Sequence, residues 1–213
     1  MNKTLSYLFD PLCGWCYGAG GPLPEILAST RLELRLLPTG LFSGAGARPM
    51  DEQFAAYAWG NDQRIERLTG QAFSERYRDK VLADRSQLFD SGPATVALTA
   101  VHLSAAEREF DALKAIQHAR YVDGLDITSL QILAHILEGL GLNDAAQRLV
   151  VPDAALRQAT QERIAQGRDL LARLGASGVP TFLLEENGQT RLLHGSAIFS
   201  NPQAFASELQ NGH

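Results

Sequence analysis

Two cysteines are the residues of this chain best suited to chemistry, and they form the tetrapeptide Cys13-Gly14-Trp15-Cys16. The sequence of 213 residues contains no other cysteine. A thiolate attacks a disulfide through a mixed-disulfide intermediate, and a second thiol one helical turn away is placed to release that intermediate. The spacing therefore predicts a dithiol that exchanges electrons with other disulfides.

The same two cysteines could instead be half of a metal site. A structural zinc site requires four nitrogen, sulfur or oxygen ligands, and a catalytic one requires three protein ligands. The chain has no second cysteine pair, and no histidine lies near this one in sequence, so His194 could reach it only through folding. We therefore expect exchange chemistry and no bound metal.

A short apolar segment directly before the first cysteine predicts a buried β-strand over residues 3–9. Asp10-Pro11-Leu12 then predicts a turn, after which Cys13 begins a helix. Free N–H groups and the positive end of the helix dipole stabilise a thiolate there by about 0.3–1 kcal/mol, and by up to ~2 kcal/mol in a partly buried position. Asp10 has two interpretations, either a turn or capping residue or a proton acceptor.

The two residues between the cysteines are expected to modulate the exchange. Gly14 leaves the sulfur of Cys13 with little steric cover, so that a substrate backbone can approach it. Trp15 is bulky, and the sequence supports two interpretations of it equally, as a half-exposed substrate contact or as simple packing. Together with Asp10, these residues surround the predicted dithiol.

A second motif, Gly178-Val179-Pro180-Thr181-Phe182, stands at the entry to another apolar run. A proline in the ordinary trans form is tolerated at the first position of a strand. A cis bond before Pro180 is the alternative that the motif favours, although only about 5–6% of X–Pro bonds in folded proteins are cis. We expect Val179, Pro180 and Thr181 to lie beside the first cysteine and to present backbone groups to an extended substrate.

The rest of the chain predicts two groups of strands separated by helices. In the first group, Leu32–Leu37 predicts a second strand that Pro38 ends, and residues 38–50 predict a loop. In the second group, a long helical segment leads into a strand, and Asn187-Gly188 between two apolar runs predicts the turn of a β-hairpin. The intervening segment has apolar residues at helical spacing.

The order of these elements is β-α-β, then a helical segment, then α-β-β-α. A Cys-x-x-Cys at the exit of the first strand, together with a distant Val-Pro-Thr, is typical of the thioredoxin fold. The predicted fold class is α/β, a thioredoxin fold split by a large all-helical insertion. We expect a discontinuous thioredoxin-like domain at residues 1–50 and 150–213, and a helical insertion domain at residues 51–149.

Four segments spread through nearly the whole chain match a known family. They are the segments Asp10-Pro11-Leu12-Cys13-Gly14-Trp15-Cys16-Tyr17-Gly18, Tyr121-Val122-Asp123-Gly124-Leu125-Asp126-Ile127, Gly139-Leu140-Gly141-Leu142 and Gly178-Val179-Pro180-Thr181-Phe182. With these segments the chain resembles the DsbA-like branch of the thioredoxin superfamily. Within that branch it is most similar to the leaderless FrnE-type proteins, which are described as predicted disulfide isomerases.

The resemblance implies an attacking thiol at Cys13, a resolving thiol at Cys16 and a cis peptide bond before Pro180. The sequence departs from the family pattern at two places. The residues between the cysteines are Gly-Trp instead of the Pro-His of DsbA or the Gly-Pro of thioredoxin, so neither reduction potential carries over. Six residues before the first cysteine, where thioredoxin and DsbA hold a buried acid, this chain has Tyr7, so that Asp10 or water could serve in its place.

Composition limits the partners of the chain. The net charge of −5, without a run of Lys or Arg, argues against nucleic acid. No segment approaches the roughly 20 apolar residues of a membrane helix, and no secretory signal follows Met1. We therefore expect a cytoplasmic location and no membrane contact, and the oligomeric state stays open.

The leading functional hypothesis is a cytoplasmic thiol–disulfide oxidoreductase that acts as a reductase or isomerase on protein or small-molecule thiols and disulfides. It requires no cofactor beyond its own redox-active disulfide, and glutathione is a candidate co-substrate. One alternative is a glutathione-dependent isomerase or transferase, against which the second thiol of Cys16 counts. Another is a peptide-binding adaptor on the same fold. The direction of electron flow stays open.

Overall fold

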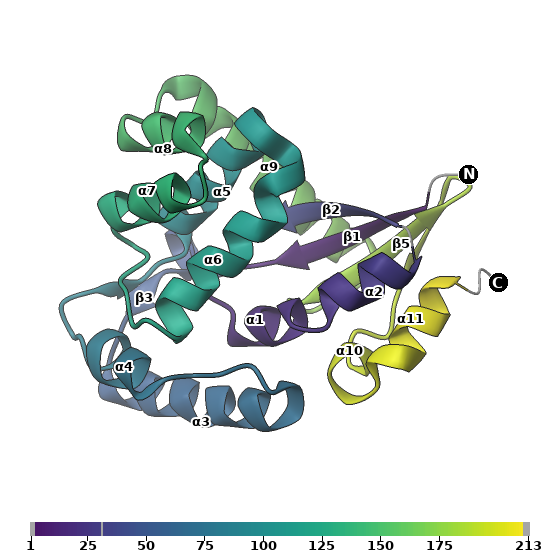
Figure 1. Ribbon diagram of the computed structural model, residues 1–213, viewed down its shortest axis with the longest axis horizontal. Helices are drawn as coiled ribbons and strands as arrows, with labels where there is room; N and C mark the ends of the chain where they lie inside the picture. Colours follow the sequence, from purple (N-terminus) through teal and green to yellow (C-terminus); the bar gives the residue numbers. More distant parts are fainter. Residues whose placement is uncertain (1–2, 31, 211–213) are drawn as a thin grey trace.

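A four-stranded sheet carries the cysteine pair at the end of its interior strand β1. The computed structural model describes residues 3–30 and 32–210 (Figure 1). The strand order is β2-β1-β5-β6, in which β2 runs parallel to β1 whereas β5 and β6 run antiparallel to their neighbours. The strands are β1 (Thr4–Phe9), β2 (Glu33–Pro38), β5 (Thr181–Glu186) and β6 (Gln189–Leu192), and a separate pair joins β3 (Arg48–Pro49) to β4 (Leu88–Phe89).

Helices cover both faces of the sheet and extend beyond its edge (Figure 1). The first part of the chain forms α1 (Gly14–Gly20), α2 (Leu23–Thr30) and the short η1 (Gly44–Gly46). The middle forms α3 (Glu52–Thr69), α4 (Glu75–Tyr77), η2 (Arg78–Leu82), α5 (Gly92–Ala105), η3 (Ala106–Arg108), α6 (Glu109–Tyr121), α7 (Leu130–Gly139) and α8 (Asn143–Val150). The last part forms α9 (Ala154–Arg173), α10 (Ala197–Ser200) and α11 (Pro202–Gln210). This order confirms the thioredoxin fold with a helical insertion.

Strand β1 is buried on both faces, which explains why its sequence is almost continuously apolar. Successive side chains of a strand point to opposite faces. Leu8 therefore joins Leu37 and Leu183 in a small cluster covered by the last turns of α9, whereas Tyr7 and Phe9 face the larger core. Figure 1 shows the two layers, with α9 behind the sheet and α1 and α2 in front of it.

A buried ion pair connects the helical insertion to the sheet. Nη2 of Arg163 on α9 donates to Oε1 of Glu109 on α6 at 2.6 Å and to the carbonyl of Leu36 on β2 at 3.0 Å. The other carboxylate oxygen of Glu109 lies 2.9 Å from Nδ1 of His102. Because the guanidinium and the carboxylate are almost completely buried, each depends on the other for its counter-charge.

Two local predictions can be compared directly with the structure. Asn187 and Gly188 have φ values of 54° and 77°, as a tight hairpin turn requires, and they join β5 to β6 as the sequence predicted. The loop predicted over residues 38–50 contains η1 and β3 instead, and Pro38 is the last paired residue of β2. A two-residue strand has no alternation for a sequence pattern to reveal.

The proposed division into residues 1–50 with 150–213, and 51–149, stays a prediction. Between residues 51 and 149, the regular elements are helices apart from β4. Residues 1, 2, 31 and 211–213 of that division lie outside the described part of the chain. Within the described part, no helix is long and apolar enough to cross a membrane.

Glu109→Gln should destabilise the protein strongly, because it leaves the buried Arg163 guanidinium without a counter-charge. Breaking a buried pair in this way typically costs about 3–5 kcal/mol. Urea unfolding should show this loss, whereas Asp111→Asn, which breaks the exposed contacts to Arg108 and Lys114, should change the unfolding free energy by less than about 1 kcal/mol. Similar losses for the two variants would contradict a structural role for the buried pair.

Candidate active site

The two cysteines occupy the start of α1, directly after β1. Cys13 is the N-cap of α1, and its sulfur accepts a hydrogen bond from the backbone N–H of Cys16 at 3.4 Å. Both thiols are free. The side chain of Cys16 is completely buried, whereas Cys13 is 7% exposed and lines an open cavity. Of the two cysteines, only Cys13 is therefore accessible to an incoming disulfide.

The proline loop lies against Cys13, as the sequence predicted. The thiol of Cys13 donates to the carbonyl oxygen of Val179 across 3.7 Å, and the Val179–Pro180 peptide bond is cis. Thr181, the first residue of β5, is buried and donates its hydroxyl to the carbonyl of Gly178 at 2.6 Å. The fold thus brings together two motifs that lie at opposite ends of the sequence.

The surroundings of Cys16 keep its sulfur protonated. Burial raises the pKa of the Cys16 thiol well above its usual value, and the hydrogen bond and the charge of Cys13 raise it further. The Tyr7 hydroxyl donates to the backbone carbonyl of Cys16 at 2.9 Å. Burial raises the pKa of Tyr7 well above its usual value too, so this position holds a neutral hydrogen-bond donor instead of an acid.

Asp10 is completely buried and fixes the loop that precedes the cysteines. Its carboxylate accepts hydrogen bonds from the backbone N–H of Leu12 at 2.9 Å, the N–H of Phe42 at 3.1 Å and the hydroxyl of Ser91 at 2.7 Å. Burial raises the pKa of Asp10, and these three hydrogen bonds oppose the rise. The contacts agree with the turn interpretation of Asp10 and join the dithiol loop to the start of α5.

Gly14 is where α1 touches α3. A Cβ atom on Gly14 would lie 2.5 Å from Oδ1 of Asp62 and 3.2 Å from Cδ1 of Ile65. The absence of a side chain is therefore required by the approach of α3, in addition to leaving Cys13 uncovered. As a result, the Asp62 carboxylate lies against Gly14, the first residue of α1.

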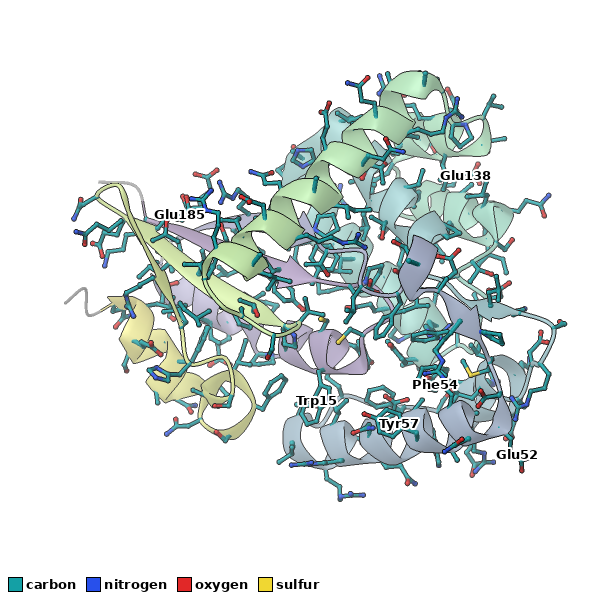
Figure 2. All side chains as sticks on the ribbon, turned by 180° about the vertical axis from the view of Figure 1, so that it is seen from behind. Trp15, Glu52, Phe54, Tyr57, Glu138 and Glu185 are labelled. Atoms are coloured by element: carbon teal, nitrogen blue, oxygen red, sulfur yellow. The ribbon has the colours of Figure 1, made fainter. Side chains whose placement is uncertain are left out.

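Trp15 is half-buried and lies at the boundary between α1 and α3 (Figure 2). Its ring packs edge to face on Phe199, with the centroids 5.2 Å apart, and the Arg64 guanidinium lies 5.7 Å from its ring centroid. Trp15 also lines the cavity beside Cys13. Both interpretations of this residue have contacts that support them, so its effect on exchange stays a prediction.

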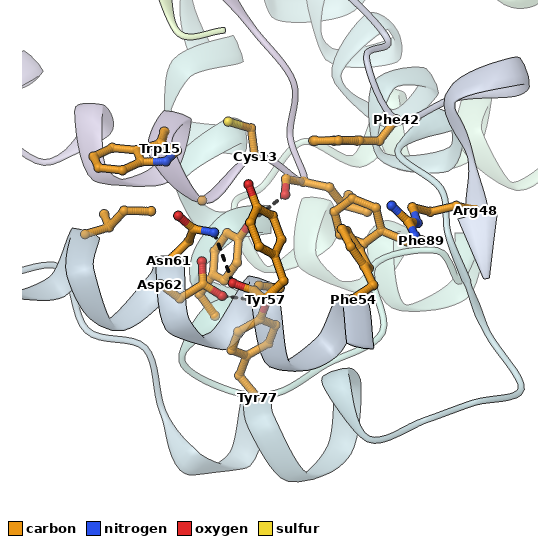
Figure 3. A pocket seen from close by; sticks show the side chains of 15 residues that line it. Cys13, Trp15, Phe42, Arg48, Phe54, Tyr57, Asn61, Asp62, Tyr77 and Phe89 are labelled. Atoms are coloured by element: carbon orange, nitrogen blue, oxygen red, sulfur yellow. Dashed lines mark hydrogen bonds between the residues drawn. The ribbon is translucent and has the colours of Figure 1, made fainter. Parts of the chain in front are cut away.

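A cavity of about 340 Å³ opens beside Cys13, and sequence reasoning missed most of its residues. Aromatic side chains form much of its wall, and these are Phe42, Phe54, Tyr57, Tyr77, Phe89 and Tyr121. Polar groups reach it from Arg48, Asn61 and Asp62 (Figure 3). The helical spacing of Phe54, Tyr57 and Asn61 indicates one face of a helix, but no sequence pattern shows that this face lies beside the cysteines.

Asp62 is a buried carboxyl group in the wall of this cavity. It is 5% exposed, and burial raises its pKa to about 7, against the opposing effects of the Tyr77 hydrogen bond and the Arg120 charge. The Tyr77 hydroxyl donates to Oδ2 of Asp62 at 3.0 Å. The sequence analysis did not select this residue, because a single Asp within a polar helix resembles an ordinary surface carboxylate.

His194, the histidine considered above as a metal ligand, pairs with a carboxylate on α11. Nδ1 of His194 lies 3.3 Å from Glu208, and the histidine side chain is 88% exposed. Among residues 3–30 and 32–210, no group of three or more His, Cys, Asp or Glu side chains is arranged to hold a metal ion. The expectation of a metal-free site stays a prediction.

The split sheet, the dithiol at the end of β1 and the proline loop beside it define a thioredoxin-fold thiol–disulfide oxidoreductase. The chain belongs to the DSBA-like thioredoxin domain family, and the model of that family matches residues 4–210. No curated protein sequence matches the chain.

Solved structures agree with this family over almost the whole chain. The cytosolic disulfide reductase DsbM from Pseudomonas aeruginosa is 35% identical, with a TM-score of 0.86 and 97% of each chain covered. The same reductase with GSH gives 33% identity, a TM-score of 0.83 and 97% coverage of each chain. A protein from Nitrosomonas europaea, provisionally described as a disulfide isomerase, shares the fold at 24% identity and a TM-score of 0.80, covering 98% of this chain and 96% of that one.

Gly14→Ala should destabilise the protein by about 1–3 kcal/mol, because the new methyl group forces Asp62 and Ile65 away from α1. Gly60→Ala is the matched control. Gly60 lies on α3 itself with no atom within 4 Å of an added Cβ, so helix propensity alone should stabilise this variant by up to about 1 kcal/mol. Thermal or urea unfolding of both variants measures the difference, and equal effects would show that Gly14 is not a contact point.

Proposed function

We propose that the chain is a cytoplasmic disulfide reductase or isomerase in which Cys13 attacks the substrate and Cys16 resolves the mixed disulfide. The observation that carries this proposal is the unequal exposure of the two cysteines. Cys13 faces a cavity large enough for a small disulfide or a substrate side chain, whereas Cys16 is completely buried one turn behind it.

The reaction begins when the Cys13 thiolate attacks one sulfur of a substrate disulfide. A Cys13–substrate disulfide forms, the substrate S–S bond breaks, and the electron pair leaves on the second substrate sulfur. Cys16 then loses its proton and attacks the Cys13 sulfur, which releases the first substrate thiol and leaves a Cys13–Cys16 disulfide. The substrate gains two electrons and two protons, and the dithiol loses them.

The cavity and the proline loop would recognise different parts of a substrate. The Val179 carbonyl lies 3.7 Å from the Cys13 sulfur, where it can accept a hydrogen bond from an extended peptide. The aromatic wall offers apolar contact to the group next to the reacting sulfur. These features suit protein or small-molecule disulfides without a further cofactor.

Glutathione is the candidate co-substrate that would return electrons to the Cys13–Cys16 disulfide. Arg48 lines the cavity and stacks over Phe54 at 4.1 Å from the ring centroid. A guanidinium in this place suits the carboxylates of glutathione. The 33% identical DsbM structure with GSH supports the same choice. The description of DsbM as cytosolic, together with the two-cysteine composition, supports a cytoplasmic location.

Cys13 should react with iodoacetamide faster than Cys16 near neutral pH, because Cys13 lines the cavity, Cys16 is completely buried and alkylation requires an accessible thiolate. Labelling of the reduced protein, followed by mass spectrometry of the peptides, measures both rates across pH. Denatured protein serves as the control, in which the two rates should become similar. Faster labelling of Cys16 in the folded protein would reverse the assigned roles.

Cys16→Ser should accumulate mixed disulfides through Cys13, since the described cavity and the rest of the sequence provide no other thiol to resolve them. Cys13→Ser should accumulate few or none. Incubation with glutathione disulfide or an oxidised protein, followed by non-reducing electrophoresis and mass spectrometry, detects these species. Equal trapping by both variants would contradict the asymmetric mechanism, and full cellular function of Cys13→Ser would favour the adaptor alternative.

A further inference from the structure

Asp62 is a buried carboxyl group that the exchange mechanism above does not use. Its Oδ1 atom lies against Gly14, the first residue of α1, at 2.5 Å from the position that a Cβ atom would take. Asp62 also lines the cavity onto which Cys13 opens (Figure 3). Asp62 and Cys13, the residue that attacks the substrate in the proposed reaction, therefore line the same cavity.

A hydrogen bond from α4 orients Asp62, and a buried cation on α6 lies nearby. The Tyr77 hydroxyl donates to Oδ2, which leaves Oδ1 directed toward α1. Behind Tyr77 lies the Arg120 guanidinium, 5.4 Å from the ring centroid and 2% exposed. In the part of the chain that the structure describes, Nε and Nη2 of Arg120 have no hydrogen-bond partner. This buried positive charge lowers the pKa of Asp62 and so opposes the effect of burial.

The ionisable groups that face Asp62 come from several elements. Tyr77 ends α4, and Arg120 and Tyr121 lie on α6. The same cavity is also lined by Cys13 before α1, Arg48 on β3 and Tyr57 on α3. Burial raises the pKa values of Tyr77 and Tyr121, so both stay neutral donors. The pKa of Asp62, at about 7, allows this group to give or take a proton at physiological pH.

We propose that Asp62 delivers a proton to the sulfur that leaves the substrate disulfide when Cys13 attacks. This proposal rests on the exchange function proposed above. The Cys13 thiolate forms a bond to one substrate sulfur, the S–S bond breaks, and its electron pair goes to the second sulfur. The Asp62 carboxylic acid protonates that second sulfur, which departs as a thiol, and the carboxylate regains a proton from solvent through the cavity.

Leaving groups of different basicity separate this role from a structural one. An alkyl thiolate is a strong base and departs more easily when it is protonated, whereas an aromatic thiolate of low pKa departs readily without a proton. Damage to the fold or to Cys13 would slow both reactions. Loss of a proton donor slows only the reaction that releases the alkyl thiol.

The test compares Asp62→Asn with the unaltered protein in single-turnover oxidation by two probes, bis-hydroxyethyl disulfide and dithiobis-nitrobenzoate. Asn keeps an acceptor for the Tyr77 hydroxyl but cannot give a proton. Below pH 7, we expect the variant to react with the dialkyl disulfide about tenfold to a hundredfold more slowly, and with the aromatic disulfide within about twofold of the unaltered rate.

In the unaltered protein, the ratio of dialkyl to aromatic rates should fall as the pH rises through about 7. Asp111→Asn, an exposed carboxylate on α6, is the control and should leave both rates unchanged.

Equal slowing with both probes, or no slowing with the dialkyl disulfide, would overturn the proposal while leaving the exchange function intact. Failure of the unaltered protein to react through Cys13 with either probe would instead refute the exchange function itself. Tyr77→Phe gives an independent measurement if Asp62→Asn does not fold. Removing the hydroxyl that stabilises the carboxylate should move the fall in the rate ratio to higher pH, and an unchanged profile would count against Asp62.

Discussion

The contact between the glycine face of α1 and the side of α3 is the constraint on which the site depends. Added Cβ atoms on Gly14 and Gly18 would lie 2.5 Å from Asp62 and 2.6 Å from Ile65, so the two helices approach each other only because these positions lack side chains. This approach converts a helical insertion into a wall of the redox site. It places a carboxylate and several aromatic rings in the wall of the cavity that Cys13 also lines.

Unequal burial distinguishes the two cysteine thiols, which are chemically identical. Cys13 sits at the edge of the cavity, where a substrate can reach it, and Cys16 lies completely inside the core. A buried thiol resists ionisation because the charged form loses its hydration, and the raised pKa of Cys16 reflects this. In the proposed mechanism, Cys16 therefore stays protonated until the mixed disulfide forms next to it.

Hydrogen bonds to buried charged groups hold the sheet and the helical insertion in a fixed relative position around this site. Asp10 joins the dithiol loop to Phe42 and Ser91, and Arg163 joins α9 to Glu109 and the β2 backbone. A buried charge without its partner is expensive, so these contacts resist any shift of the insertion relative to the sheet. The cavity beside Cys13 depends on that relative position, because its wall contains residues from the start of the chain and from the helical insertion.

The sequence by itself determined the features that arise from local patterns. The Cys-x-x-Cys, the Val179-Pro180-Thr181 motif and the Asn187-Gly188 turn predicted the fold class, the dithiol and the loop beside it, since turn chemistry and apolar periodicity act over a few residues. The tertiary structure alone decided which surface the insertion presents to Cys13. Asp62 and Arg120 belong to helices far apart in sequence. Only the folded chain shows that burial beside α1 raises the pKa of the Asp62 carboxyl group, and that the Arg120 charge opposes part of this rise.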